Sequence, residues 1–244
     1  MRNILLKIEY EGTGYSGWQS QKNARSIQDT IEAALERLTG RKARLISCGR
    51  TDAGVHAVTH FANFKTPSDI PTYKLQRALN GVLPKDIVIK QAAEVPLKFH
   101  ARFDARSKTY RYTIMTGNSP SAIERNLTAY IPYKLNLALM KRESKALLGK
   151  HDFKSFQASD RIDRSSVRTI KKLRLKKQGE KIIIDIEADG FLYNMVRNIA
   201  GTLIDIGRGR ISEGSMRGIL KAKDRKAAGE TAPSRGLCLI EVKY

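Results

Sequence analysis

Residues 48–56 (CGRTDAGVH) bring together more reactive side-chain types than the stretches around them. The loop places the carboxylate Asp52 two residues from Arg50, with glycines close on either side. Glycine and aspartate are also the commonest turn residues, so a plain turn is the competing interpretation. If the loop is functional, its small neighbours allow an ionised carboxylate close to a nucleic-acid backbone, while Arg50 reaches a phosphate or a base edge.

Two residues far along the chain are further candidates. Arg197 lies in an apolar helical stretch, where a buried guanidinium is costly unless it is paired. Tyr110 alternates with Tyr112 and Ile114, a pattern typical of a strand, so core packing is the default interpretation of its ring. Arg197 is therefore a site candidate on chemistry alone, and Tyr110 is not.

Several neighbouring residues have two interpretations. Tyr15 and Trp18, beside glycines, could stack on RNA or anchor the base of a loop. His56 fits a hydrogen-bonded loop histidine better than a catalyst. The string at 207–210 (GRGR) fits a helix end followed by a turn.

The periodicity of the first half predicts the order β-α-β-β-α-β. Ser26 is a plausible helix N-cap, and Gly40 a helix end. The expected strands are residues 4–10, 43–48, 58–65 and 87–95, and the expected helices are residues 27–38 and 73–83.

The second half repeats this order without a residue-level repeat. The expected strands are residues 109–116, 166–177, 181–188 and 236–244, and the expected helices are residues 137–148, 193–206 and 213–220. The pattern predicts an α+β fold of two ferredoxin-like βαββαβ halves, residues 1–104 and 105–244, with helices on one face. Two similar units commonly hold a ligand cleft between them, so we expect an RNA-binding cleft there.

Charge indicates the partner. The chain has 45 Lys and Arg against 24 Asp and Glu, for a formal net charge of +21. Such an excess favours nucleic acid, whose phosphates release counterions when cations replace them. A membrane surface is disfavoured, because the basic residues are spread through structured-looking segments. The N-terminal apolar run is too short for a signal peptide, which predicts a cytoplasmic protein.

Eight cations lie between residues 161 and 177. A charge run is usually a solvated face, but with this net charge we favour a surface that tracks phosphates. Its members are Arg161, Arg164, Arg168, Lys171, Lys172, Arg174, Lys176 and Lys177.

The string at 49–57 (GRTDAGVHA) resembles the signature of the TruA family of tRNA pseudouridine synthases. Four further segments resemble that family in the same order, and together they span essentially the whole chain. They are residues 10–21 (YEGTGYSGWQSQ), 99–103 (FHARF), 107–112 (SKTYRY) and 191–199 (FLYNMVRNI).

The resemblance implies roles for four residues. Asp52 is implied to be catalytic, and Arg50 to displace the target nucleotide from its stack. Tyr110 is implied to pack against the target base, and Arg197 to pair with the catalytic carboxylate. The resemblance also implies one extended, mainly antiparallel sheet, targets at positions 38, 39 and 40 of the tRNA anticodon stem-loop, and a homodimer that binds one tRNA across both subunits.

The implied reaction needs no cofactor and no metal. Uracil is detached from C1′ at N1, rotated and rejoined at C5, with no redox change. One carboxylate can act as nucleophile or base, and the residues leave open whether Asp52 attacks the base at C6, attacks C1′ or removes a sugar proton. The alternative, a non-catalytic RNA-binding module with tandem ferredoxin-like units, is disfavoured because the chain has no RNP1-type aromatic string. A metal-dependent nuclease would need clustered carboxylates, which the loop lacks.

Overall fold

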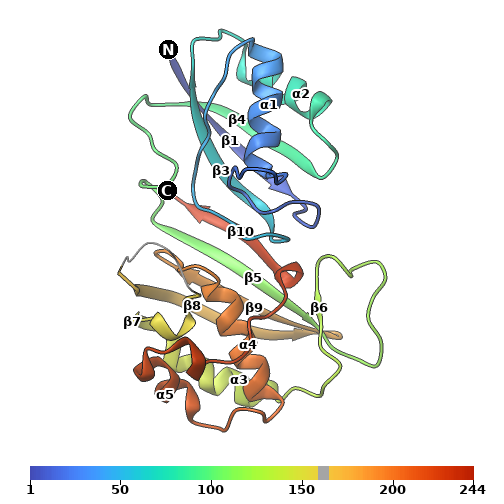
Figure 1. The fold of residues 1–244 in the computed structure, drawn as a ribbon, viewed down its shortest axis with the longest axis vertical. Helices are drawn as coiled ribbons and strands as arrows, with labels where there is room; N and C mark the ends of the chain where they lie inside the picture. The colour runs from blue at the N-terminus through green and yellow to red at the C-terminus, as the bar shows by residue number, and fades with distance from the viewer. Residues whose placement is uncertain (159–164) are drawn as a thin grey trace. The chain divides into compact units, whose positions relative to one another are not determined.

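The computed structural model describes residues 1–158 and 165–244, which form two compact units (Figure 1). Unit 1 comprises Met1–Arg106 together with Cys238–Tyr244, and unit 2 comprises Ser107–Leu237. The end of the chain therefore belongs with the first unit. Two cations of the predicted basic run, Arg161 and Arg164, lie outside the described residues.

Unit 1 follows the order β-α-β-β-α-β and adds the last strand of the chain. Strand β3 accepts neighbours on both edges: β1 pairs with it antiparallel, β2 is antiparallel to it, and β10 is parallel to it. Strand β4 lies antiparallel on the far side of β1. The elements are β1 (Arg2–Tyr10), α1 (Ile27–Thr39), β2 (Ile46–Ser47), β3 (His56–Thr66), α2 (Thr72–Val82), β4 (Ile87–Val95) and β10 (Leu237–Lys243).

Helix α1 begins and ends at the predicted signals. The hydroxyl of Ser26 accepts a hydrogen bond from the amide of Asp29 at 3.0 Å, as an N-cap does. Gly40 ends the helix with a φ of +69°, a left-handed conformation that favours glycine. Ile31 and Leu35 are fully buried, so one face of the helix packs into the unit.

The strand predicted over residues 43–48 is much shorter in the structure. Only Ile46–Ser47 form β2. The amide of Leu45 instead donates to the carboxylate of Glu32 on α1, at 2.8 Å. A side chain from a neighbouring helix thus replaces the strand ladder at this position, which local periodicity does not report.

Unit 2 has a four-strand antiparallel path in the order β5-β9-β8-β7, with β6 parallel to β5. Short 3₁₀ turns follow α3, β7 and α5, and another directly precedes β10. The elements are β5 (Ser107–Met115), β6 (Ala129–Tyr130), α3 (Leu137–Ser144), β7 (Gly149–Asp152), β8 (Val167–Gln178), β9 (Lys181–Ala188), α4 (Met195–Gly207) and α5 (Ser215–Ala222).

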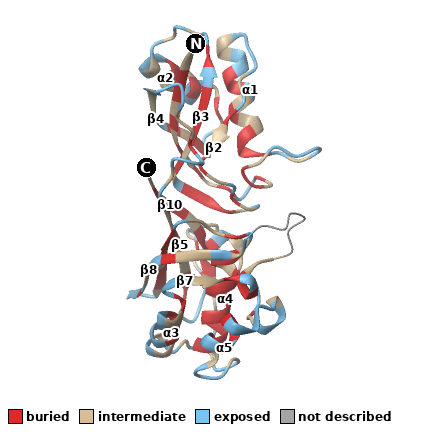
Figure 2. Ribbon diagram, turned by 90° about the vertical axis from the view of Figure 1, so that its left-hand side faces the viewer, coloured by how far each residue is buried: buried red, intermediate tan, exposed pale blue. Residues whose placement is uncertain are grey.

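Helix α4 is the central helix of unit 2 and packs against α3 and β5. It starts two residues later than predicted, because Asn194 has a φ of +59° and interrupts the helical backbone. It is buried along almost its whole length (Figure 2). The mixed α/β class with mainly antiparallel pairing is confirmed. Across the described parts of the chain, no helix has the length and apolarity that crossing a membrane requires.

Candidate active site

The Asp52 loop is a turn in its backbone. The amide of Val55 donates to the carbonyl of Asp52 at 3.2 Å, and Gly54, at the third position, has a φ of +74°. The side chain of Asp52 is half-buried, whereas Arg50 is exposed. A turn and a site are therefore compatible here, because the turn fixes the position from which Asp52 projects.

A second segment, residues 12–18, lies directly against this loop. The amide of Trp18 donates to the carbonyl of Thr51 at 3.1 Å, and the amide of Gly54 donates to the carbonyl of Tyr15 at 3.3 Å. Gly17 approaches so closely that a β-carbon there would lie 2.5 Å from the Thr51 oxygen. The backbone on both sides of Asp52 is thus held by a neighbouring loop.

A buried cluster of polar and aromatic side chains contacts Thr51, the residue before Asp52. The hydroxyl of Tyr10 lies 2.8 Å from the Thr51 hydroxyl and 3.3 Å from Nδ1 of His60. The His60 ring stacks on Trp18, with centroids 3.8 Å apart and an interplanar angle of 16°. All four side chains are buried. Hydrogen bonds are stronger in a low-dielectric interior, so the contact with Tyr10 fixes the side chain of Thr51, next to Asp52.

Burial decides between the two interpretations of the aromatic residues. Trp18 is 1% exposed and Tyr15 is 3% exposed, so both anchor the loop and neither presents a face to RNA. The Tyr15 hydroxyl donates to Asp86 at 2.6 Å, and burial, followed by this hydrogen bond, raises the pKa of Tyr15 above its ordinary value. Nδ1 of His56 accepts from the Gly12 amide at 3.0 Å, so the ring is hydrogen-bonded as expected, although His56 is the first residue of β3 and not part of the loop.

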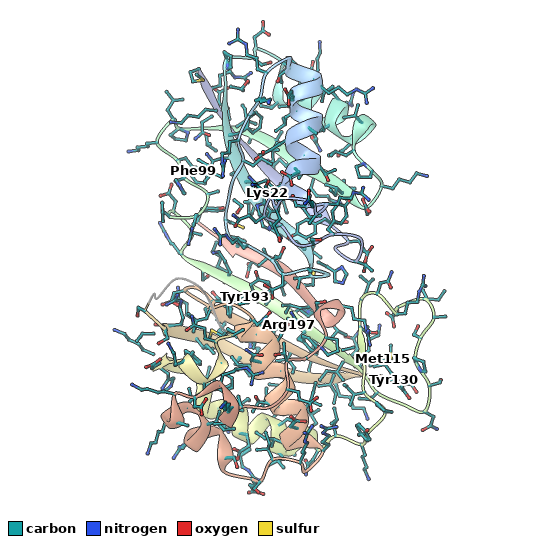
Figure 3. The ribbon with its side chains drawn as sticks, viewed as in Figure 1. Lys22, Phe99, Met115, Tyr130, Tyr193 and Arg197 are labelled. Atoms are coloured by element: carbon teal, nitrogen blue, oxygen red, sulfur yellow. The ribbon has the colours of Figure 1, made fainter. Side chains whose placement is uncertain are left out.

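Arg197 is positioned by the first turn of α4 (Figure 3). It is half-buried, while the other residues of α4 are all buried. Its Nε donates to the carbonyl of Ala232 at 2.8 Å, and one terminal nitrogen donates to the side chain of Asn194 at 3.0 Å. These bonds satisfy a cation that the positive end of a helix dipole would otherwise disfavour. The guanidinium is therefore held in a defined place at the start of the helix.

Tyr110 lies on β5 with its ring largely covered. The side chain is 7% exposed and makes an edge-on contact with Phe191, with centroids 5.1 Å apart. Core packing, the default expected from the alternation, is therefore present. A base that stacks on this ring requires neighbouring side chains such as Phe191 to move.

The four predicted site residues divide between the units. Arg50 and Asp52 lie in unit 1, and Tyr110 and Arg197 lie in unit 2. Sequence reasoning missed the supporting trio of Tyr10, Thr51 and His60. A usable signal was present, since His60 is a polar residue within a strand pattern and Tyr10 ends another, but their contact depends on how β1 and β3 pair.

The fold and the charge describe a basic α+β protein suited to binding nucleic acid. The family model described as tRNA pseudouridine synthase matches residues 7–104 and 144–244. The chain belongs to this family of isomerases, which convert uridine into pseudouridine in tRNA. The alternative of a non-catalytic RNA-binding module is thereby rejected.

Two relatives can be aligned with this chain over its full length. A tRNA pseudouridine synthase A of Caldicellulosiruptor bescii is 50% identical over 244 residues, with all of both chains covered. One of Acetivibrio thermocellus is 48% identical over the same span, again with all of both chains covered. A solved structure described as a Cbf5-Nop10-Gar1 complex has a TM-score of 0.35 and 12% identity, and the match covers 96% of this chain and 57% of that one.

Proposed function

We propose that the chain isomerises uridine at positions 38, 39 and 40 of the tRNA anticodon stem-loop, with Asp52 as the catalytic carboxylate. The observation that supports this most is that hydrogen bonds from neighbouring segments hold the Asp52 loop in place. Residues on either side of Asp52 are fixed by hydrogen bonds and a buried network, while the carboxylate itself is only half-buried. A catalytic group held by rigid neighbours matches the positional precision that catalysis requires.

The reaction needs little from the protein beyond position and charge. The N1–C1′ bond breaks and a C5–C1′ bond forms, the proton on C5 is lost, and N1 gains a proton. An ionised Asp52 serves as nucleophile or base in this sequence. Exclusion of water would raise the pKa of such a carboxyl group, and a paired cation opposes that change. We assign this pairing to Arg197, whose guanidinium is already oriented by Ala232 and Asn194.

Two further residues act on the target nucleotide in this proposal. The base must leave its stack, at a cost of a few kcal/mol. Arg50, which is exposed, takes part in that displacement. Tyr110 receives the extruded base against its ring, a contact worth about 1–3 kcal/mol, once its neighbours have moved.

The same resemblance supports a cytoplasmic homodimer that binds one tRNA across both subunits. A dimer would double the basic surface offered to a single substrate. Analytical ultracentrifugation with and without tRNA tests this, and a chain that stays monomeric in both conditions contradicts it.

The decisive assay uses tRNA with tritium at uridine C5, because isomerisation must release that tritium. We expect Asp52→Asn to lower single-turnover release by at least about 10³-fold with tRNA affinity largely kept, as for loss of a residue acting in the transition state. The control Asp69→Asn changes an exposed aspartate of unit 1 and should match wild type. Wild-type-like release by Asp52→Asn would overturn the assignment of Asp52.

A further inference from the structure

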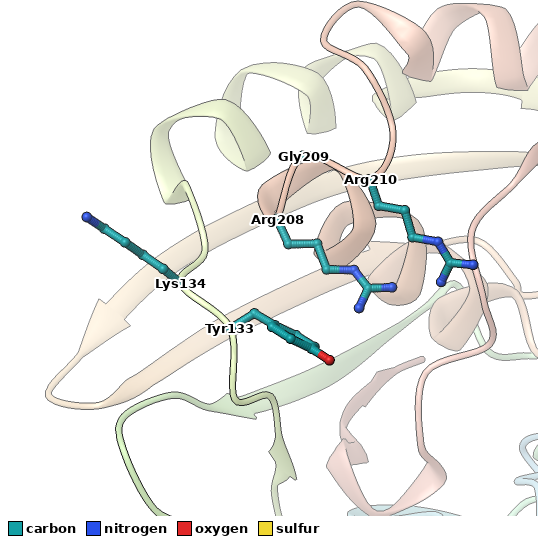
Figure 4. Close-up of a pocket in the computed structure, with 5 residues that line it drawn as sticks. All are labelled: Tyr133, Lys134, Arg208, Gly209 and Arg210. Carbon is teal, nitrogen blue, oxygen red and sulfur yellow. The ribbon is translucent and has the colours of Figure 1, made fainter.

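Unit 2 has a basic hollow that none of the roles above uses (Figure 4). It has a volume of about 640 Å³ and opens to solvent. Three of its lining residues are cations and one is aromatic. The lining residues are Tyr133, Lys134, Arg208, Gly209 and Arg210.

Arg208 is only partly satisfied in this hollow. It follows the end of α4, where it forms an ion pair with Asp205 at 2.7 Å and lies over the Tyr133 ring at 5.2 Å. Its Nε is buried and has no hydrogen-bond partner among the described residues. A buried donor without an acceptor is rare in native structures, and it leaves this guanidinium only partly compensated.

The other two cations are available to a ligand at low cost. Lys134 is exposed. Arg210 pairs with Glu230 at 2.5 Å, but their side chains are 56% and 73% exposed. Exposed ion pairs contribute little to stability, so an incoming anion can replace Glu230 without a large penalty.

Helix α4 connects Arg197, in its first turn, to Arg208, which follows its last residue and lines the hollow. Arg208 follows Arg197 by eleven residues. Eleven residues are close to three whole turns, so the two side chains share a face about 16 Å apart. The segment that carries Glu230, the partner of Arg210, also carries the Ala232 carbonyl bound by Arg197, so one stretch of chain contacts Arg197 and Arg210.

We propose that this hollow binds a backbone phosphate of the substrate tRNA, away from the target nucleotide. A distance of about 16 Å spans only a few nucleotide steps of an RNA helix, so one stem can reach both Arg197 and the hollow. The phosphate oxygens accept from Lys134 and Arg210, and the Arg208 guanidinium, which lies over the Tyr133 ring, adds positive charge beside them. The inference rests on the proposed function only in placing the target nucleotide near Arg197.

The test measures tRNA affinity against salt for Lys134→Gln with Arg210→Gln. We expect Kd to rise by about tenfold at 0.1 M salt and the log–log salt slope to fall by about 1, as for one lost phosphate contact. Single-turnover tritium release at saturating tRNA should be unchanged. The matched control Arg217→Gln with Lys221→Gln removes the same charge from exposed positions of α5 and should leave the slope unchanged.

A variant of opposite sign separates binding from structure. Glu230→Gln releases Arg210 and should tighten tRNA binding by about 2- to 3-fold at low salt, since it removes a competing carboxylate. Weaker binding by Glu230→Gln, or equal losses in the double variant and its control, would overturn the proposal. So would binding of inorganic phosphate alone at 1 mM, which would make the hollow a small-anion site. If wild type bound tRNA but released no tritium, the proposed function would fail. The affinity comparison would still show whether the hollow binds tRNA.

Discussion

Close backbone packing around Asp52 makes two glycines indispensable. A β-carbon at Gly12 would lie 2.0 Å from the Val55 carbonyl oxygen, and one at Gly17 would lie 2.5 Å from the Thr51 oxygen. Gly17 also has a φ of +97°, which side chains rarely adopt. The position of Asp52 is therefore set by main-chain contacts that leave no room for a side chain.

A pair of alanine substitutions in one loop tests this. We expect Gly17→Ala to cost about 2 kcal/mol or more in the free energy of unfolding, from strain and overlap together. Gly14→Ala should be neutral or stabilising by up to about 1 kcal/mol, since no atom lies within 4 Å of a β-carbon there. Urea denaturation of both variants gives the comparison. Equal stabilities would show that the loop adjusts freely.

The buried hydroxyl of Tyr10 gives a second test. Tyr10→Phe keeps the ring but removes the bonds to Thr51 and His60, worth about 1 kcal/mol. We expect single-turnover tritium release to fall by about 3- to 10-fold while tRNA affinity stays constant, because the loss acts on the placement of Asp52. Tyr130→Phe removes a hydroxyl bonded to the Gly117 carbonyl in unit 2 and is the control. A change in affinity with an unaltered rate would contradict this role.

At the scale of residues, features that depend on neighbours in the sequence could be predicted. The turn at Asp52 could be predicted because it depends on adjacent residues, whereas His56 lies at the start of β3 and is bonded by Gly12 from a distant segment. Trp18 had two equal interpretations, and only its burial decides between them. The Tyr10–His60 contact was out of reach, because it joins residues 50 apart through the pairing of two strands.

At the scale of elements, long periodic segments were predictable and short ones were not. The bounds of β4 and β9 agree with the periodicity to the residue, and α1 begins and ends at its predicted caps. Strands β6 and β7 were missed, since elements of two and four residues are defined by their partners. Helix α3 ends at Ser144 and tightens into a 3₁₀ turn, which periodicity cannot distinguish from helix.

The missed strand β7 ends in a carboxylate with a pH-dependent role. Asp152 accepts from the Ser166 hydroxyl at 2.5 Å and forms an ion pair with Lys223 at 3.1 Å. The Ser166 hydrogen bond, and then Lys223, hold the pKa of Asp152 below its ordinary value. A lowered folded-state pKa means that the stability from this carboxylate is present above the unfolded-state pKa. It is lost as the pH falls through the folded-state pKa.

The corresponding variant is Asp152→Asn. We expect it to lower the urea midpoint at pH 7 and to approach wild type as the pH falls below the ordinary carboxyl range. Ser166→Ala removes the largest cause of the pKa shift but leaves the ion pair with Lys223 in place. It should therefore show a smaller loss of stability with a pH dependence in the same direction. A deficit for Asp152→Asn that is constant with pH would show that packing, and not ionisation, carries the effect.

At the scale of the whole molecule, charge and strand register give the basic run a definite place. On β8, Lys172 pairs with Glu187, whereas Leu173 pairs with Ile186, which is also the partner of Tyr110. Successive residues of a strand face opposite sides, so Lys172 and Tyr110 lie on opposite faces of the unit 2 sheet. The run remains a predicted RNA surface, but a nucleotide at Tyr110 does not touch this part of it.

Such a surface acts on the approach of tRNA more than on the bound complex. Changing Lys172, Arg174 and Lys176 to Gln should lower the association rate at 50 mM salt by severalfold, because these three cations supply only part of the electrostatic steering. The difference should close near 1 M salt, where the Debye length is about 3 Å. Stopped-flow binding measures both. A salt-independent difference would indicate direct contacts instead.

The pairing of β10 with β3 also sets an order of events. Cys238 and Leu239 lie beside His56 and Ala57, at the start of the strand that follows the Asp52 loop. Unit 1 is therefore discontinuous in sequence, with all of unit 2 inserted before its last strand. On the ribosome, where chains emerge at about 5–20 residues per second, the edge of β3 beside the Asp52 loop waits roughly 10–40 seconds for its partner. Completion of unit 1 is thus deferred until unit 2 has been synthesised, so a stalled chain displays an open strand edge beside the Asp52 loop.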